Sequence, residues 1–305
     1  MGKASANRLI QNDVNLSPLG LGIEHFARGV RKVTNLTRDE NSKLIIEEAY
    51  KLGITHYDLV FNLPYFFDVF RDFIRNKRKK VTFTTHLGSF YNEKANGHSK
   101  TRSLKKIQTT FEGMLESLNI DYADIALIQF VAHKDDYEDV IKKGVLDYTL
   151  QLKKEGKAKT VGVSAHNPEL LIRMIEKAEF DVIMFPLNFA TGPLKSTKKL
   201  IDVCKEKEIA VIAIKNLLKG KAFSTKSTNY PAYFCGGRNL KMKLDEPATP
   251  AACMNYGFDS GADTVVFGVK TVEELRENFK SYKNPYESKD YSPTVVQFEN
   301  AIFNQ

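Results

Sequence analysis

The sequence predicts an α/β protein of the (β/α)8 TIM barrel class. Short apolar segments alternate with segments whose apolar residues recur at helical spacing, and this alternation occurs eight times. No Gly-x-Gly-x-x-Gly motif follows any of the expected strands, which argues against an open dinucleotide-binding sheet. A barrel carries its chemistry at the carboxyl ends of its strands. Polar residues that end or follow a strand are therefore the candidates for a site.

The first half of the chain contains four strand and helix pairs. The strands are expected at 17–23, 53–58, 80–86 and 124–130, and the helices at 37–52, 65–76, 103–118 and 136–155. Thr37 and Glu40 have the spacing of a capping box at the start of the first helix. The strand at 124–130 is apolar on both faces, as expected within a buried parallel sheet. Asp58 and His86 each end a strand, where a barrel places its reactive groups.

The second half repeats the alternation and ends in a tail. The strands are expected at 160–164, 181–186, 209–215 and 264–268, and the helices at 169–178, 196–208, 249–260 and 272–281. Gly156 is at a C-cap position, and Asn167 and Pro168 open the helix that follows. The periodicity fails over 216–247, so we expect a long functional or mobile loop after the seventh strand. We expect one domain, 1–305, with the tail 282–305 packed on the barrel and a short helix near 295–303.

Composition favours a cytoplasmic protein with reduced thiols. The chain of 305 residues is 42% hydrophobic, enough for a large core, and its net charge of +8 comes from lysines spread among acidic residues. We interpret the basic run 75–80 as a solvated helix end, and no nucleic-acid motif accompanies it. The three cysteines form no C-x-x-C pair, so no metal site is expected. The chain has no signal core and no membrane-length apolar run. The oligomeric state is left open.

Several short motifs, taken together, resemble the aldo-keto reductase superfamily. They are Gly53 with Asp58, the run 117–125, Gly162-Val163-Ser164, Asn188, and Gly268-Val269-Lys270 with Glu277-Asn278. Each motif is short, but their order and spacing cover most of the chain. The resemblance implies a barrel that binds NADP(H) and acts on a small carbonyl or alcohol substrate.

The resemblance also implies four catalytic positions, of which one keeps the family residue. Asp58 matches the family aspartate, while the tyrosine, lysine and histidine positions hold Leu63, His86 and Gln129. Leucine cannot donate a proton, so we expect His86, beside Asp58, to act as the acid or base; the alternative is a purely structural pair. Gln129 can still hydrogen-bond a carbonyl group. Tyr65 either faces the site as a substitute donor or packs on the barrel rim.

The cofactor positions implied by the resemblance lie in the second half of the chain. Ser164 and Asn188 match nicotinamide-binding positions, Lys270 after Gly268 matches a position that meets the 2′-phosphate, and Glu277 and Asn278 match adenine-binding positions. The family's Ser-Pro-Leu-Gly-x-Gly cradle is replaced by 215–220, which keeps one of its glycines and introduces two lysines.

The two lysines of this altered cradle have separate expected roles. Lys219 could pair with phosphate. Lys215 could reach the pocket, either paired with a carboxylate or as a Schiff-base lysine. His25 and His166 also follow strand ends, as site contacts or as ordinary loop histidines.

Three functions remain open from the sequence. The first is an NADP(H)-binding oxidoreductase with altered acid-base residues. The second is a non-redox lyase, dehydratase or epimerase that uses His86 and Lys215 for proton abstraction. The third is a pseudoenzyme that keeps the barrel without turnover. Fold similarity does not choose among them, because barrels host many chemistries.

Overall fold

The chain folds into a closed barrel of eight parallel strands, which confirms the (β/α)8 prediction. The computed structural model describes residues 7–27, 34–60, 62–92, 94, 97–284, 286–287 and 290–303. Around the barrel the strand order is β10, β11, β14, β3, β4, β5, β8, β9. The strands are β3 Leu19–Gly22, β4 His56–Leu59, β5 Thr82–Leu87, β8 Ala123–Val131, β9 Ala158–Ala165, β10 Val182–Pro186, β11 Ala210–Ile214 and β14 Thr264–Gly268.

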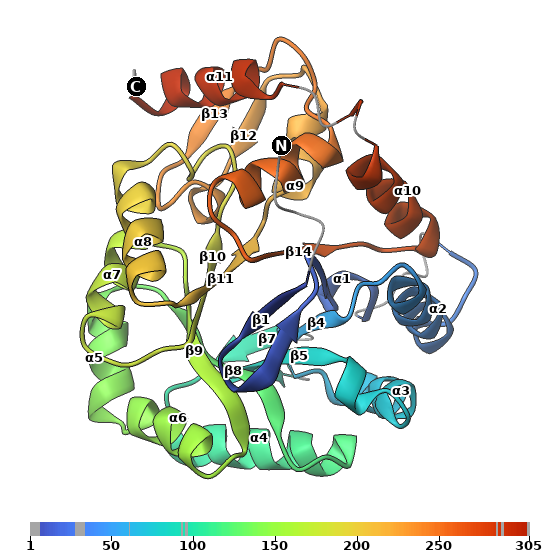
Figure 1. Cartoon of the computed structure of the whole chain (residues 1–305), viewed down its shortest axis with the longest axis vertical. Helices are drawn as coiled ribbons and strands as arrows, with labels where there is room; N and C mark the ends of the chain where they lie inside the picture. Colours follow the sequence, from blue (N-terminus) through green and yellow to red (C-terminus); the bar gives the residue numbers. More distant parts are fainter. Residues whose placement is uncertain are drawn as a thin grey trace.

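Helices surround the strands (Figure 1). They are α1 Glu24–Ala27, α2 Arg38–Lys51, α3 Pro64–Ile74, α4 Leu104–Leu118, α5 Lys134–Lys142, α6 Val145–Lys154, α7 Pro168–Ile175, α8 Lys195–Glu206, α9 Pro250–Asp259 and α10 Val272–Lys283. The capping box at the start of α2 is formed, since Thr37 accepts from the Glu40 amide while its own amide donates to the Glu40 carboxylate. Asn167 likewise caps α7.

The single helix expected over 136–155 is two helices, and that prediction was wrong. The break is at Gly144, whose φ of +71° is a conformation that glycine adopts without steric cost. Val140 and Val145, on either side of the break, are both fully buried. The apolar pattern therefore continues across the break and hides it from a periodicity argument.

A hairpin that the sequence pattern did not reveal closes the amino end of the barrel. It consists of β1 Arg8–Ile10 and β2 Val14–Leu16, joined by the short 3-10 turn η1 Gln11–Asp13. Val14 and Leu16 are buried and belong to the same apolar cluster as Leu127 and Val266 inside the barrel. This cluster fills the interior near the amino end, so the accessible end is the carboxyl one.

Additional elements lie beyond the carboxyl ends of the strands. The hairpin β6 Ser89–Asn92 and β7 Gly97–Lys100 follows β5, whereas η2 Arg78–Lys80 precedes β5 and lies at the amino end. The segment 216–247 contains η3 Leu218–Phe223, β12 Thr228–Tyr230, η4 Ala232–Phe234 and β13 Leu240–Met242. The tail helix α11 Ser292–Phe303 runs beside β12 and β13, at the top of Figure 1. Phe298 of α11 packs on Phe189 and Tyr230, so this layer has an apolar core of its own.

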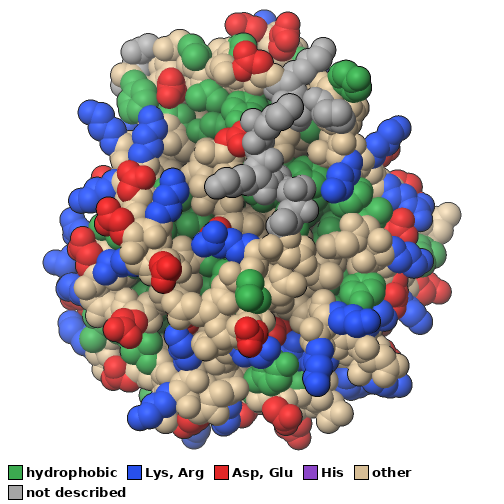
Figure 2. Space-filling view, in the orientation of Figure 1, with side chains coloured by type: hydrophobic (Ala, Val, Ile, Leu, Met, Phe, Trp, Pro, Cys, Tyr) green, Lys and Arg blue, Asp and Glu red, His purple; other side chains and the backbone are tan. Residues whose placement is uncertain are grey.

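On the face shown in Figure 2, basic and acidic side chains are interspersed. Among the described residues, no helix combines the length and apolar character that a membrane crossing needs. The same residues hold no group of three or more His, Cys, Asp or Glu side chains arranged to bind a metal ion.

Candidate active site at the carboxyl ends of the strands

A cavity of about 370 Å³ lies at the carboxyl ends of the barrel strands. Met184, Ile214 and Val266 give it apolar lining. Its polar lining includes groups from β4, β5 and β8 and others that end or follow β9 and β11. In the closed strand order, β5 and β11 are four strands apart in either direction, so the groups that these two strands carry face each other from opposite walls.

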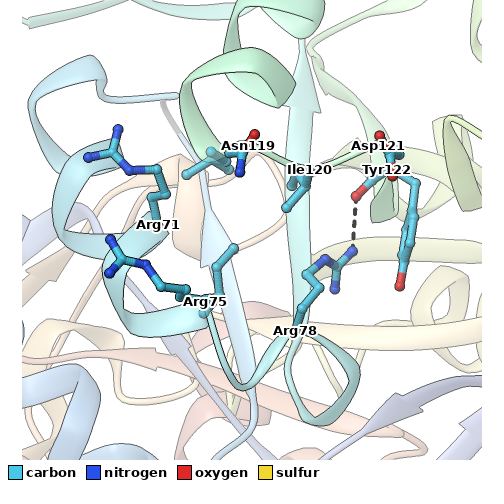
Figure 3. Close-up of a pocket in the computed structure, with 9 residues that line it drawn as sticks. Arg71, Arg75, Arg78, Asn119, Ile120, Asp121 and Tyr122 are labelled. Atoms are coloured by element: carbon cyan, nitrogen blue, oxygen red, sulfur yellow. Dashed lines mark hydrogen bonds between the residues drawn. The ribbon is translucent and has the colours of Figure 1, made fainter.

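A second hollow, of about 410 Å³, lies at the amino end between α3 and the turn before β8 (Figure 3). Three arginines border it, and each is paired with a carboxylate: Arg71 with Asp68, Arg75 with Asp72 and Arg78 with Asp124. Figure 3 also shows Arg78 donating to the carbonyl group of Tyr122. These cations are already neutralised by the protein, and barrels carry their chemistry at the other end. We therefore place the candidate site in the 370 Å³ cavity.

Asp58, His86 and Gln129 form a hydrogen-bonded chain on one wall of that cavity. His86 Nε2 lies 2.7 Å from Asp58 Oδ1, and His86 Nδ1 is bonded to Gln129 Oε1. The three residues lie on the neighbouring strands β4, β5 and β8, so the structure brings together the sequence candidates at these positions. His86 is 1% exposed and Asp58 4%.

The chemistry of these contacts restricts the protonation states of His86. Nε2 faces a carboxylate, which only accepts, so Nε2 carries a proton. Nδ1 faces an amide that can present either its oxygen or its NH2 group, so Gln129 can match both the protonated and the neutral imidazole by rotating. A gain or loss of the Nδ1 proton therefore leaves the chain hydrogen-bonded.

The end of β8 that carries Gln129 is held by a buried ion pair. Arg102 donates to the Gln129 carbonyl at 2.8 Å and to Asp136 at 2.8 Å. Burial acts to raise the pKa of Asp136, but hydrogen bonds from Arg102 and Lys100 outweigh it and hold that pKa far below its usual range. Asp136 stays ionised and fixes Arg102, which fixes the backbone of Gln129.

Lys215 follows β11, opposite His86, and it is bonded to His166, which follows β9. Lys215 Nζ lies 2.7 Å from His166 Nε2. Burial lowers the pKa of Lys215 to about 7; Glu24 acts to raise it and Lys219 to lower it. Burial, with Lys215 as a second cause, lowers the pKa of His166 to about 3. His166 is therefore neutral near pH 7, and its Nε2 accepts a hydrogen bond from the lysine amine.

Tyr65 lies on the rim, which is the second of the two positions expected for it. Its ring packs edge-on against Tyr91, with 5.3 Å between ring centroids, and the Arg38 guanidinium lies 4.0 Å from its centroid. Leu63, at the family's tyrosine position, is buried in the core at 1% exposure. The phenol that does line the cavity comes from elsewhere in the chain.

That phenol is Tyr233 of η4, which the sequence reasoning missed. Lys215 Nζ lies 5.2 Å from the centroid of its ring. The only signal was the aromatic character of 216–247, and this does not tell which ring turns inward. Glu24 and His25 of α1 also line the cavity. The sequence did offer a signal for Glu24, because it is a charged residue directly after the first expected strand.

Of the predicted cofactor positions, Ser164 and Gly268 border the cavity and Asn188 does not. A Cβ on Gly268 would lie 2.6 Å from the His25 ring, so glycine is needed there. Asn188 is buried instead, where its amide donates to the carbonyl groups of Lys215 and Phe234. It joins β11 to the segment 216–247.

The remaining predicted cofactor residues lie outside the cavity. Lys270 is exposed before α10, and its amide donates to the Glu274 carboxylate at 2.7 Å. Glu277 is exposed and Asn278 is buried, both on α10. Lys219 is exposed and its Nζ lies 5.7 Å from the centroid of the Tyr233 ring. The predicted nucleotide positions thus divide between the cavity and the surface around α10 and η3.

The Aldo/keto reductase family model matches residues 18–294, nearly the whole chain. The chain belongs to the aldo/keto reductase family. The chain is 30% identical over 151 residues to human Aldo-keto reductase family 1 member C2, and this match covers 45% of the chain and 44% of the relative. It is 25% identical over 176 residues to L-glyceraldehyde 3-phosphate reductase of Escherichia coli K12, and this match covers 54% of the chain and 46% of the relative. The chain thus spans about half the length of these relatives.

Solved structures resemble this aldo/keto reductase over almost its full length. An aldo-keto reductase from Bacillus halodurans in its holo form has a TM-score of 0.71 at 16% identity, covering 95% of this chain and 96% of that one. An aldo-keto reductase complexed with NADPH has a TM-score of 0.63 at 18% identity, covering 98% of this chain and 88% of that one. At these identities the likeness shows the fold.

Proposed function

We propose that this aldo/keto reductase is an oxidoreductase that binds NADP(H) and acts on a small carbonyl or alcohol substrate, with Asp58, His86 and Gln129 as its altered acid-base group. The hydrogen-bonded chain of these residues at the wall of the cavity carries the proposal. Family membership supports the reaction class. A solved relative complexed with NADPH supports the nucleotide.

The residues present fit NADP(H) at its nicotinamide end and at its 2′-phosphate end. Ser164 offers a hydroxyl at the cavity, and Gly268 has no side chain of its own there. Lys270 is an exposed cation just before α10, at the end of the helix where the helix dipole favours a phosphate. Asn188 would act indirectly, because both hydrogens of its amide are used by carbonyl groups of the protein.

NADP(H), when bound, supplies or accepts the hydride. The protein supplies the proton: a carbonyl oxygen that takes the place of the Gln129 amide at His86 Nδ1 would receive the proton of the doubly protonated ring. Asp58 stabilises that charged ring through the 2.7 Å contact to Nε2. Burial of the pair strengthens this interaction relative to water.

Titration with NADPH and NADH tests the nucleotide part. The chain has 13 tyrosines and no tryptophan, so quenching of tyrosine fluorescence or a shift of the melting temperature reports binding. We expect NADPH to bind more tightly than NADH. Lys270→Met should weaken NADPH about tenfold, as expected for one charge-assisted contact, and leave NADH unchanged. No response to either nucleotide would contradict the proposal.

NADPH consumption with a panel of small aldehydes and ketones tests the catalytic part. His86→Ala should abolish turnover, because it removes the only proposed proton donor. Tyr65→Phe is the matched control, since that hydroxyl lies on the rim and its loss should change the rate less than about twofold. Equal rates in His86→Ala and the unmodified protein would reject the assignment.

A further inference from the structure

Lys215 has a different kind of partner from other lysines that the structure describes. Half-buried Lys153 pairs with Asp181 at 2.5 Å, and exposed Lys100 pairs with Asp136 at 2.7 Å. Lys215 Nζ is instead bonded to an imidazole, and it lines a cavity that a small molecule can enter. Carboxylate partners keep a lysine charged, whereas a neutral imidazole in a buried place does not.

We propose that Lys215 is a nucleophilic amine that forms a reversible Schiff base with small uncharged aldehydes bound in this cavity. The reaction goes beyond the oxidoreductase proposal and needs no nucleotide. It also uses the wall opposite His86. A carbonyl oxygen turned toward His86 on β5 belongs to the first reaction, and a carbonyl carbon turned toward Lys215, after β11, belongs to this second one.

The surroundings of Lys215 keep a large share of its amine uncharged near neutral pH. Its pKa of about 7 leaves roughly half of the amine uncharged at pH 7, against less than about 0.1% for a lysine of ordinary pKa. The charged and titratable groups around it are Glu24 and His25 from α1, His166, Lys219 and Tyr233. Asp58 and His86 face it across the cavity.

The condensation is balanced by the two protons of the neutral amine. The Nζ lone pair attacks the carbonyl carbon, and one Nζ proton passes to the carbonyl oxygen, which becomes the hydroxyl of a carbinolamine. The second Nζ proton leaves with that hydroxyl as water, so amine and aldehyde give imine and water. His166 Nε2, 2.7 Å from Nζ, orients the amine by accepting a hydrogen bond from it. No oxidant or reductant is needed.

Size and charge define the class of carbonyl compound. The volume of about 370 Å³ is near the lower limit of ligand pockets, which favours a compact molecule. Glu24 and Asp58 in the lining oppose a substrate carboxylate, while Met184, Ile214 and Val266 accept an alkyl chain. A small neutral aldehyde fits these conditions better than a 2-oxo acid.

The backbone around Lys215 explains how the amine is aimed. Lys215 has a φ of +60°, a conformation that costs a non-glycine residue roughly 1 kcal/mol or more. Its carbonyl accepts a hydrogen bond from the buried Asn188 amide, which ties this strained turn to the end of β10. The Tyr233 ring lies over the amine and limits its contact with water.

Trapping the imine in the full-length protein without nucleotide tests the proposal. Propanal and sodium cyanoborohydride at about pH 7.5 convert the imine into a stable propyl-lysine, which peptide mass spectrometry locates. We expect Lys215 to be alkylated faster than exposed Lys219 by on the order of 100-fold, allowing for the weaker nucleophilicity of an amine with a low pKa. Alkylation of Lys215 no faster than of Lys219 would overturn the proposal, whatever the nucleotide titration shows.

Two further experiments test whether the labelling depends on the Lys215 amine and on the charge of the carbonyl compound. Lys215→Arg keeps a cation but cannot form an imine, so rapid alkylation should vanish while its melting temperature shows that the chain is folded. Glyoxylate, an aldehyde that carries a carboxylate, should label Lys215 at least about tenfold more slowly than propanal because of the carboxylates in the lining. Rapid labelling of another residue in Lys215→Arg would show that the reactive amine lies elsewhere.

Discussion

The two ends of the barrel use charged groups differently. At the amino end, three aspartates at strand starts each accept a hydrogen bond from a backbone amide of a neighbouring strand and pair with a cation. The amide and the cation are those of Phe83 and Arg78 for Asp124, of Val161 and Lys153 for Asp181, and of Val211 and Arg8 for Asp263. At the carboxyl end, His86 contacts the Asp58 carboxylate on one side and an amide that can rotate on the other, and Lys215 contacts a neutral imidazole.

The difference shows how one fold separates stability from reactivity. Burial raises the pKa of Asp124. The Arg78 guanidinium acts to lower the same pKa, and it pairs with the carboxylate as a salt bridge. Lys215 feels the same burial, but its neutral partner does not oppose the shift, and its pKa falls to about 7. The partner, and not burial alone, decides which groups are available for chemistry.

The largest effect should come from breaking a pair at the amino end. Asp124→Ala leaves Arg78 without its carboxylate and the Phe83 amide without an acceptor, so we expect a loss of about 3–5 kcal/mol in the free energy of unfolding. Urea unfolding measures it. Exposed Asp121→Ala is the control and should change stability by less than about 0.5 kcal/mol. Equal costs for the two variants would show that the pairing adds nothing.

The fold was predictable from sequence because each strand and helix has its own apolar pattern. The exceptions had physical causes: Gly144 breaks a helix without disturbing the pattern, and the hairpin at Arg8–Ile10 and Val14–Leu16 is too short to show one. The segment 216–247 had no period because its short elements are held by tertiary contacts, such as those of Phe298 with Tyr230.

The site was predictable only in part, since position along a strand tells which residues reach the carboxyl end but not where they point. Asp58, His86 and Gln129 end neighbouring strands, so adjacency followed from topology. Asn188 also follows a strand, yet its amide turns to backbone carbonyls. Tyr233 reaches the cavity from a segment whose path depends on distant contacts. The neutral partner of Lys215, His166, is 49 residues away in sequence.

An intermediate effect should appear as a pH dependence of stability. The folded pKa of Lys215, about 7, is below its unfolded value of 10.5, so between these values the unfolded chain binds more protons. Stability then rises with pH in this window and is flat below it. Relative to Lys215→Met, the unmodified protein should gain about 2 kcal/mol between about pH 7.5 and about pH 9.5, measured by urea unfolding. A constant difference would mean that the lysine is charged when folded.

The smallest and sharpest effect concerns the two charges that act on Lys215 from opposite directions. Glu24 raises its pKa and Lys219 lowers it, so Glu24→Gln should move the midpoint of propanal labelling against pH downward and Lys219→Gln should move it upward. Each shift should be less than about one pH unit, because salt and solvent screen charges near the mouth. Since the two variants remove one charge each from the same region, shifts of the same sign would trace the effect to altered packing. Shifts of opposite sign would show that the electrostatic surroundings of the amine set its reactivity, the feature that distinguishes this end of the barrel from the other.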